Sequence, residues 1–374
     1  MLFYTFKILM MSYNKKFIHV SVSIKRYLEM NLVVEESDKE LLRSLVYGQS
    51  VSVNISSLSK SLNKHRNTIQ AKVNDLFKYN IITRPFYPFI GLFKEYPFLI
   101  LTDADLLYNE SVEKWFVEDP NIFAAFRSRY SEYNTLLILY HKDIKNYELW
   151  REKLTVDGPL ALNNNYPTRS STSIYLNDFM IKYNPNAPVY LMEEELKKNQ
   201  KINLGGYNLD NLDFKIIKLL LGGKCIKINE SQLSNEFKLH RSTILRRTQK
   251  LIDEGLISNP VCRFPNFYAP LGYILAVCKL NIKSNKAEFI KNIRNDPHIT
   301  MANTTHTGGY NLLLFAAFRD LDEELKWEVH NSALFPECFD KIDVHFYSLA
   351  GAIDVGHQKI SLAVKDEKYM YFRI

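Results

Sequence analysis

The spacing of apolar residues changes along the second half of the chain. Between residues 209 and 257 apolar residues recur every three or four positions, for example Leu212, Ile216 and Leu219, and this period predicts amphipathic helices. From residue 272 the segment GYILAVCKLNI is rich in β-forming residues and alternates apolar with polar positions, which predicts a strand. We therefore expect a small helical part followed by a part that contains a sheet.

The helical part contains three short helices by its start and stop signals. Gly222-Gly223 ends the first helix, and Asn229 can cap the second with Gln232 three residues on. The third is HRSTILRRTQKLIDEG, after which LIS at 256–258 is predicted as a strand and NPVCRFPNF as a hairpin-like loop. Three short helices followed by a strand and a loop are typical of a winged helix-turn-helix.

The following part alternates strand and helix patterns in the order βαββαβ. This order is that of a ferredoxin-like module. The predicted strands are 272–282, 298–307, 310–318 and 339–351, and the predicted helices are 286–297 and 322–334.

The first half of the chain repeats this organisation. Residues 38–82 align with 213–257 without a gap, and 13 of the 45 positions are identical. Further along, Asp119-Pro120 matches Asp296-Pro297. The chain is therefore two copies of one two-part unit.

The repeat predicts an α+β fold in which two winged helix-turn-helix domains alternate with two ferredoxin-like βαββαβ domains. A polar stretch with a Gly pair between the copies is predicted to be a linker. The expected boundaries are 1–34 for an N-terminal arm, 35–85 for the first winged helix-turn-helix, 86–194 for the first ferredoxin-like module, 195–208 for the linker, 209–265 for the second winged helix-turn-helix, and 266–374 for the second ferredoxin-like module with a C-terminal extension.

Composition narrows the class of protein further. The 374 residues carry a net charge of +7, which permits an anionic partner without demanding one. The four cysteines form no C-x-x-C pair, so we expect free, buried thiols in a reducing cytoplasm, no zinc site and no cofactor. No apolar run reaches the roughly 18 residues of a membrane helix, so no membrane association is expected.

The third helix of each copy is the candidate DNA-binding surface, with double-stranded DNA as the partner. Its first turn offers hydroxyl and guanidinium groups for phosphates, and Arg or Gln further along suits base edges in the major groove. A plain solvated face is the alternative, and the first copy has fewer cations. The candidates are Arg66, Asn67, Thr68, Gln70 and Asn74 in the first copy, and Arg241, Ser242, Thr243, Arg246, Arg247, Gln249 and Lys250 in the second.

His65 and His240 precede these two helices, where a small hydroxyl residue would cap best. We expect both histidines to cap or pack, or to reach a phosphate. A catalytic or metal-binding role is not expected for either.

The segments LDNLDFKIIKLL, LSNEFKLHRSTILRRTQKLIDEGLIS and THTGGYNLLL resemble the Lrp/AsnC family of transcription regulators. The resemblance implies a DNA-binding regulator whose sheet modules pair and bind a small effector, such as an amino acid, near Thr307, Gly308, Gly309 and Tyr310. Three features depart from the family. This chain has two units instead of one, Ser131-Glu132 replaces the Gly pair in the first copy, and Asn134 and Asn311 stand where the family often has Asp.

Two units on one chain can pair as an intramolecular pseudo-dimer, because tethering raises their effective concentration. The two heads could then address unlike half-sites about one helical turn of DNA apart, or a multiple of it. Association into a homodimer through free sheet edges stays open.

Two other readings compete with a regulator. The two-part unit also resembles siroheme decarboxylases, enzymes that act on a tetrapyrrole, and His306, Arg127 and Arg129 are the residues that such a site could recruit. The other reading is an interaction protein that has lost DNA binding. We do not expect an enzyme, because the basic recognition-like helix of the second copy is a surface that a decarboxylase does not need. The sequence also lacks a P-loop, a G-x-S-x-G elbow and an H-E-x-x-H motif.

Overall fold

The computed structural model describes residues 36–88, 96–128, 132–156, 158–162, 165–184, 186–199, 201–204, 206–253, 257–284, 286–306, 309–339, 342–348 and 351–353. The expected N-terminal arm and nearly all of the expected C-terminal extension lie outside these ranges. The chain divides into two compact units, residues 1–40 and 41–374. Of the first unit only the start of helix α3 (Glu36–Val46) is described, and the following paragraphs concern the second.

Each copy begins with short helices and two short strands, in matching order. Asn54 and Asn229 cap the matching helices α4 and α12, since each side-chain oxygen accepts the N–H three residues on. Asp210 and Asp213 form a capping box at the start of α11. The elements after α3 are β1 (Val51–Val53), α4 (Ile55–Leu62), α5 (Arg66–Lys78) and β2 (Thr83–Phe86), followed in the second copy by α11 (Asn211–Leu221), β9 (Ile226–Ile228), α12 (Glu230–Phe237), α13 (Arg241–Asp253) and β10 (Val261–Arg263).

Gly48 and Gly223 occupy equivalent turns after the first helix of each copy. Both have positive φ, +70° and +75°, and both approach a proline carbonyl. A Cβ at Gly48 would lie 2.4 Å from the Pro85 oxygen, and one at Gly223 would lie 3.0 Å from the Pro260 oxygen. The close approach explains why glycine occurs at this point in both copies.

We expect Gly48→Ala to lower the free energy of unfolding by about 2 kcal/mol, because left-handed backbone strain adds to a clash with Pro85. Gly206→Ala is the matched control, since Gly206 has φ +85° but nothing within 4 Å of its Cβ position. The control should cost only about 1 kcal/mol in urea unfolding. Equal costs in the two variants would contradict a role for the close approach.

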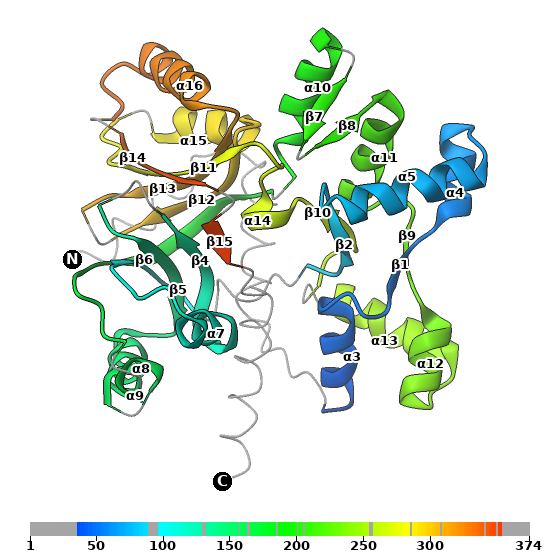
Figure 1. Ribbon diagram of the computed structural model, residues 1–374, viewed down its shortest axis with the longest axis horizontal. Helices are drawn as coiled ribbons and strands as arrows, with labels where there is room; N and C mark the ends of the chain where they lie inside the picture. Colours follow the sequence, from blue (N-terminus) through cyan, green and yellow to red (C-terminus); the bar gives the residue numbers. More distant parts are fainter. Residues whose placement is uncertain are drawn as a thin grey trace, which may run out of the picture. The chain divides into compact units, whose positions relative to one another are not determined.

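The remaining elements build one nine-stranded antiparallel sheet with helices, and the architecture is α+β. Its strand order is β14-β11-β13-β12-β6-β3-β5-β4-β15 (Figure 1). The first-copy elements are β3 (Phe98–Ala104), α7 (Glu110–Glu118), β4 (Ile122–Arg127), β5 (Thr135–His141), α8 (Ile144–Val156), α9 (Pro159–Leu162) and β6 (Ser170–Tyr183). Those of the second copy are α14 (Pro265–Tyr268), β11 (Ile274–Leu280), α15 (Lys286–Asn295), β12 (Ile299–Thr305), β13 (Leu312–Phe318), α16 (Leu321–Leu334), β14 (Asp343–Ser348) and β15 (Ala352–Ile353).

The first copy contributes four strands and the second contributes five, and the copies join where β12 pairs with β6, from Met301 opposite Tyr183 to Thr305 opposite Asn177. The sheet is curved, so that β4 and β14, from opposite ends of the strand order, come close together. The rings of Phe126 on β4 and Tyr347 on β14 lie 5.6 Å apart. Inner faces of both halves share one hydrophobic core. The two halves of the chain thus pair with each other.

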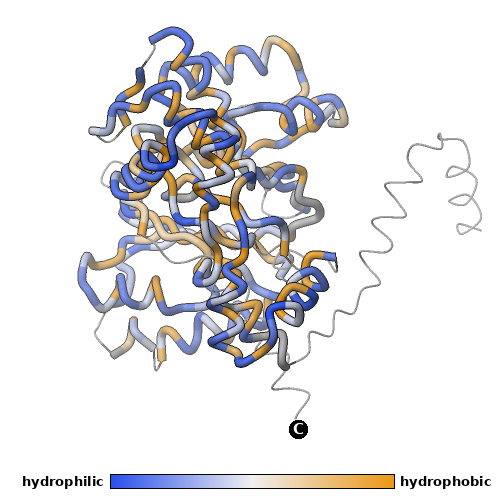
Figure 2. Tube along the Cα trace, turned by 90° about the vertical axis from the view of Figure 1, so that its right-hand side faces the viewer, coloured by the Kyte–Doolittle hydropathy of each residue, from blue (hydrophilic) through white to orange (hydrophobic). Residues whose placement is uncertain are grey.

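Helices cover the outer faces of the sheet. Phe289 of α15 and Trp327 of α16 pack on the second half, and Trp115 of α7 and Tyr147 of α8 pack on the first. In Figure 2 hydrophobic and hydrophilic stretches alternate along the helices, as expected for elements with one buried face. No helix among the described residues is long and apolar enough to cross a membrane.

Two small sheets connect the helical parts of the two copies. Strand β1 pairs with β9, placing Val51 opposite Ile228, and β10 pairs with β2. Of the strand expected at 256–258, Leu256 lies outside the described residues and Ile257 forms a single bridge. The regular strand is β10, and its partner β2 comes from the other copy instead of a local hairpin. Its position follows from that distant partner, since Thr83 Oγ1 also donates a hydrogen bond to the Arg263 carbonyl.

The segment expected as a linker, 195–208, is structured. Helix α10 (Val189–Asn199) runs into it, and a hairpin of β7 (Ile202–Leu204) and β8 (Tyr207–Leu209) follows. Leu196, Ile202 and Leu204 are buried, so a few apolar positions among polar neighbours dock the segment on the core. All four cysteines are free, and three are buried while Cys225 is half-buried.

Candidate nucleic-acid interface and effector turn

Helix α13 has a buried face and a polar exposed face. Ile244, Thr248 and Leu251 point into the core. Every polar candidate of this helix lies toward the surface. Arg241, Ser242, Arg246, Gln249 and Lys250 are exposed, and Thr243 and Arg247 are half-buried. Gln249 donates to Asp253 at 2.7 Å along the helix, which orients its side chain.

The two histidines cap these helices, as expected. The Nδ1 atom of His65 accepts the Asn67 N–H at 3.2 Å, and the Nδ1 atom of His240 accepts the Ser242 N–H at 3.3 Å. Both rings must therefore carry any single proton on Nε2. The capping leaves Nε2 as the atom that could reach a phosphate.

Helix α5 of the first copy presents a smaller exposed polar face. The five candidates on it are all exposed: Arg66, Asn67, Thr68, Gln70 and Asn74. Gln70 donates to Asn74 at 2.9 Å. Ala71 occupies the position that Arg246 has in α13, so this face has lost a cation at its middle.

Lys72 on α5 forms ion pairs with two carboxylates of the other copy. Its Nζ lies 2.9 Å from Asp210 and 2.8 Å from Asp213 at the start of α11. Burial lowers the pKa of Lys72, but the hydrogen bonds that its ammonium group donates to Asp213 and Asp210 outweigh burial and raise the pKa. Nearby, the rings of Tyr79 and Tyr207 lie 5.1 Å apart. Lys72 therefore forms an ion-pair contact between the helical parts of the two copies.

The effector turn is described only in part. Thr307 and Gly308 lie outside the described residues. Gly309 has φ +80° with open space at its Cβ position, which fits a tight hairpin turn. The Tyr310 hydroxyl donates to Asp343 at 3.2 Å, and its carbonyl accepts from Thr305 at 2.7 Å.

Tyr310 belongs to a group of polar side chains on the inner faces of the sheet, which we call the inter-sheet polar cluster. Asp343 lies 3.5 Å from Lys279 and 3.2 Å from His345. Tyr347 of the second copy hydrogen-bonds to Asp103 of the first copy. The cluster comprises Asp103, Tyr175, Lys279, Tyr310, Asp343, His345 and Tyr347.

The two carboxyls of this cluster differ in protonation. Burial raises the pKa of Asp103, and the more distant charges of Lys279 and His345 do not offset it. Burial also acts on Asp343, but Lys279 and His345 outweigh it and lower the pKa of that carboxyl. The hydroxyl of Tyr175 is buried, and burial raises its pKa to about 12 although a hydrogen bond with Ser173 acts in the opposite direction. The cluster therefore offers one carboxyl that protonates readily beside one that stays charged.

Asn134 and Asn311 perform the same structural task in the two copies. The Asn311 amide accepts from the Ile282 N–H at 2.7 Å and donates to the Ile282 carbonyl at 2.8 Å. Asn134 makes the same pair with Leu106, at 3.0 Å for each bond. A carboxylate could accept the backbone hydrogen bond but could not donate one, so only the amide of asparagine can make both bonds at each position.

Of the residues expected for a tetrapyrrole site, Arg127 and His306 are among the described residues. Arg127 is buried and donates to the carbonyls of Leu106 and Leu107 and to the Thr135 hydroxyl, so it braces the first half of the sheet. His306 holds Leu176 through its backbone N–H. Arg129 lies outside the described residues.

No protein-family model matches the chain, and no curated protein matches it. Among solved structures, the siroheme decarboxylase NirDL gives a TM-score of 0.45 at 10% identity, over 89% of this chain and 100% of that one. A transcriptional regulator from Neisseria meningitidis in complex with L-Met gives 0.27 at 23% identity, over 37% and 90%. AsnC from E. coli gives 0.26 at 14% identity, over 40% and 97%. All three TM-scores are below 0.5.

Proposed function

We propose that the protein is a DNA-binding regulator of the Lrp/AsnC type, with two winged helix-turn-helix heads alternating with two ferredoxin-like modules. The observation that carries this proposal is the outer face of α13. Arg241, Arg246, Gln249 and Lys250 are exposed there, while the opposite face of the same helix is buried.

In this proposal the first turn of α13 contacts phosphates through the side chains of Arg241 and Ser242. Arg246 and Gln249, further along, read base edges in the major groove. The first head binds more weakly, because Ala71 replaces the central arginine. The β1–β9 and β2–β10 pairings connect the two heads, so in this proposal both heads bind DNA as one rigid unit.

Arg241→Ala/Arg246→Ala should weaken binding to duplex DNA roughly thirtyfold, since each arginine contact contributes about 1 kcal/mol. The slope of log K against log salt should become shallower by about 1, because Arg241 is the one proposed phosphate contact that the variant removes. Fluorescence anisotropy over a salt series measures both quantities.

Lys142→Gln/Lys145→Gln is a charge-matched control, because both lysines are exposed and lie on the first-copy sheet part. It should bind DNA like the wild type. The converse variant, Ala71→Arg, should strengthen binding by the first head. Loss of affinity in the control as large as in the α13 variant would reject groove docking by this helix.

The inter-sheet polar cluster is where the proposed effector would bind. Asp343 can pair with an ammonium group and Lys279 with a carboxylate, so the cluster suits both ends of an amino acid. Tyr310, at the turn implied by the family resemblance, contacts Asp343 directly. The effector class in this proposal is therefore an amino acid.

The same cluster favours a second candidate function, an enzyme of the siroheme-decarboxylase type. Lys279 supplies a cation and His345 a ring nitrogen for the carboxylates of a tetrapyrrole, and Asp103 is a carboxyl whose pKa burial raises. Mixing the protein with an iron porphyrin and recording the absorbance tests this candidate. A shifted porphyrin band that disappears in Lys279→Met/His345→Gln would support it, and an unshifted band would reject it.

A further inference from the structure

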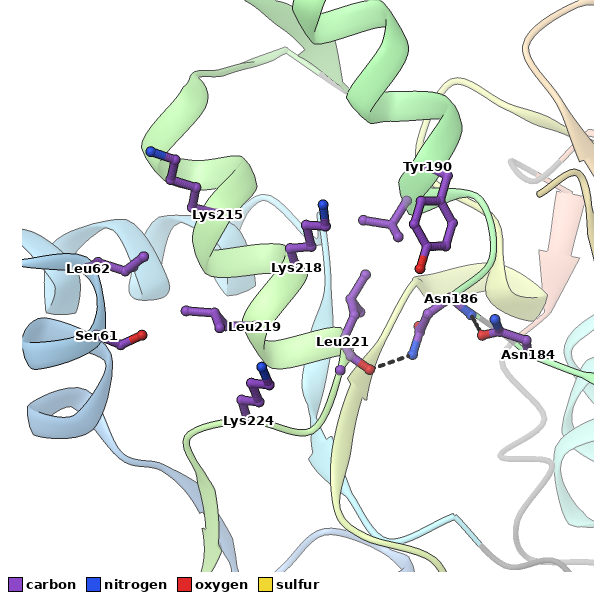
Figure 3. Close-up of a pocket in the computed structure, with 12 residues that line it drawn as sticks. Ser61, Leu62, Asn184, Asn186, Tyr190, Lys215, Lys218, Leu219, Leu221 and Lys224 are labelled. Carbon is purple, nitrogen blue, oxygen red and sulfur yellow. Dashed lines mark hydrogen bonds between the residues drawn. The ribbon is translucent and has the colours of Figure 1, made fainter. Parts of the chain in front are cut away.

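A cavity of about 470 Å³ lies between the helical parts of the two copies and the segment that connects them. Ser61 and Leu62 at the end of α4 form one wall, and Tyr190 of α10 forms another (Figure 3). Helix α11 lies between them and contributes Leu219. This volume is in the range of small-molecule sites.

The cavity is lined by three lysines and by no acidic side chain among the described residues: Lys215, Lys218 and Lys224. Lys218 is neutralised by Glu193, whose oxygens lie 2.8 and 3.0 Å from its Nζ. No ion pair is found for Lys215 or Lys224 within the part of the chain that the structure describes. Two uncompensated positive charges therefore line one cavity.

The last carbonyl groups of α11 are hydrogen-bonded without the ammonium groups of these lysines. Gly223, with φ +75°, donates to the Leu220 carbonyl, and the Lys224 N–H donates to the Leu219 carbonyl at 2.8 Å. Asn186 donates its side-chain N–H to the Leu221 carbonyl at 2.9 Å. The last carbonyls are satisfied by this closure, so the ammonium groups stay available to a ligand.

We propose that this cavity, the lysine pocket, binds a small organic anion that joins a phosphate group to a flat apolar part. Lys224 holds the phosphate, and Lys215, further along the exposed face of α11, adds positive charge at the other end of the cavity. The Tyr190 ring, 57% exposed, stacks on the flat part. Because the walls come from both copies and from the connecting segment, the ligand fixes them relative to one another. The site is distinct from the effector turn and does not depend on DNA binding.

Isothermal titration of the full chain with adenosine monophosphate tests the proposal, since this probe joins a phosphate to a flat ring system. Lys215→Gln/Lys224→Gln should weaken binding at least tenfold. The charge-matched Lys142→Gln/Lys145→Gln should bind like the wild type. Tyr190→Ala should weaken binding of adenosine monophosphate but leave that of inorganic phosphate unchanged. Absence of binding, or equal weakening in the control, would overturn the proposal.

Phosphates can also come from a DNA backbone, and a second titration separates the two sources. If adenosine monophosphate binds and the pocket variant keeps its DNA affinity, the ligand is a small molecule, as proposed. If the pocket variant loses DNA affinity and the wild type does not bind adenosine monophosphate, the lysines contact DNA and the proposal is wrong.

Discussion

Replacing Lys72 with Met should lower the free energy of unfolding by about 4 kcal/mol at pH 7, because the change leaves a buried carboxylate without its cation. Asp213 is only 1% exposed, and Lys72 is its one cationic partner in the described residues. Methionine keeps the aliphatic stem, so the loss is that of charge. Urea unfolding of the full chain measures it.

The cost should shrink as the pH falls. Burial already raises the pKa of Asp213 above its usual value. Without Lys72 the pKa of Asp213 rises further. The variant therefore loses stability as the pH rises through that higher pKa, and it regains stability at lower pH, where the carboxyl is protonated. Lys72→Met/Asp213→Asn should recover most of the loss at pH 7. Lys78→Met, exposed on the same helix, should change stability by less than about 0.5 kcal/mol. A pH-independent cost would argue against an ionic origin.

The Lys72 contact also shows what the sequence could and could not predict. Helices and strands of the sheet parts follow from local periodicity, and the predicted strand 310–318 contains the observed Leu312–Phe318. Caps are equally local, as the predicted pairing of Asn229 with Gln232 shows. Residues 72 and 213 are 141 positions apart, and no local pattern encodes their contact.

The same limit applies to the connections between the heads. Strands β1 and β9 have three residues each, and each is stabilised by a partner from the other copy. Such short segments carry no strand signal of their own. The same holds for β10, which begins at Val261, whereas the sequence predicted a strand at 256–258. The exposed candidates on α13 were predictable because one face of an amphipathic helix must point outward once Ile244 and Leu251 are assigned to the core.

Stability should also depend on pH through His298, where the two copies differ. Asp296 accepts from the His298 N–H and from its Nδ1, each at 2.9 Å, and Glu323 lies 3.6 Å from Nε2. Burial lowers the pKa of His298, but Asp296 and Glu323 outweigh burial and raise it to about 9. The histidine is therefore charged in the folded protein at neutral pH.

A raised histidine pKa stabilises the fold below the unfolded value of about 6.5, and this contribution is lost as pH rises through about 9. We expect about 3 kcal/mol of unfolding free energy to disappear between pH 6 and pH 10 from this group. Asp296 acts oppositely, since its pKa is lowered and its contribution is lost only as pH falls below about 4.

The first copy supplies the matched variant, because Asn121 stands where the second copy has His298. Its backbone and side-chain N–H groups donate to Asp119 at 2.8 and 3.4 Å. His298→Asn should therefore fold, and urea unfolding from pH 6 to pH 10 should show a flatter stability profile than the wild type. Asn121→His should steepen the profile, because it places a histidine beside Asp119. Parallel profiles for wild type and His298→Asn would mean that His298 is neutral in the folded protein.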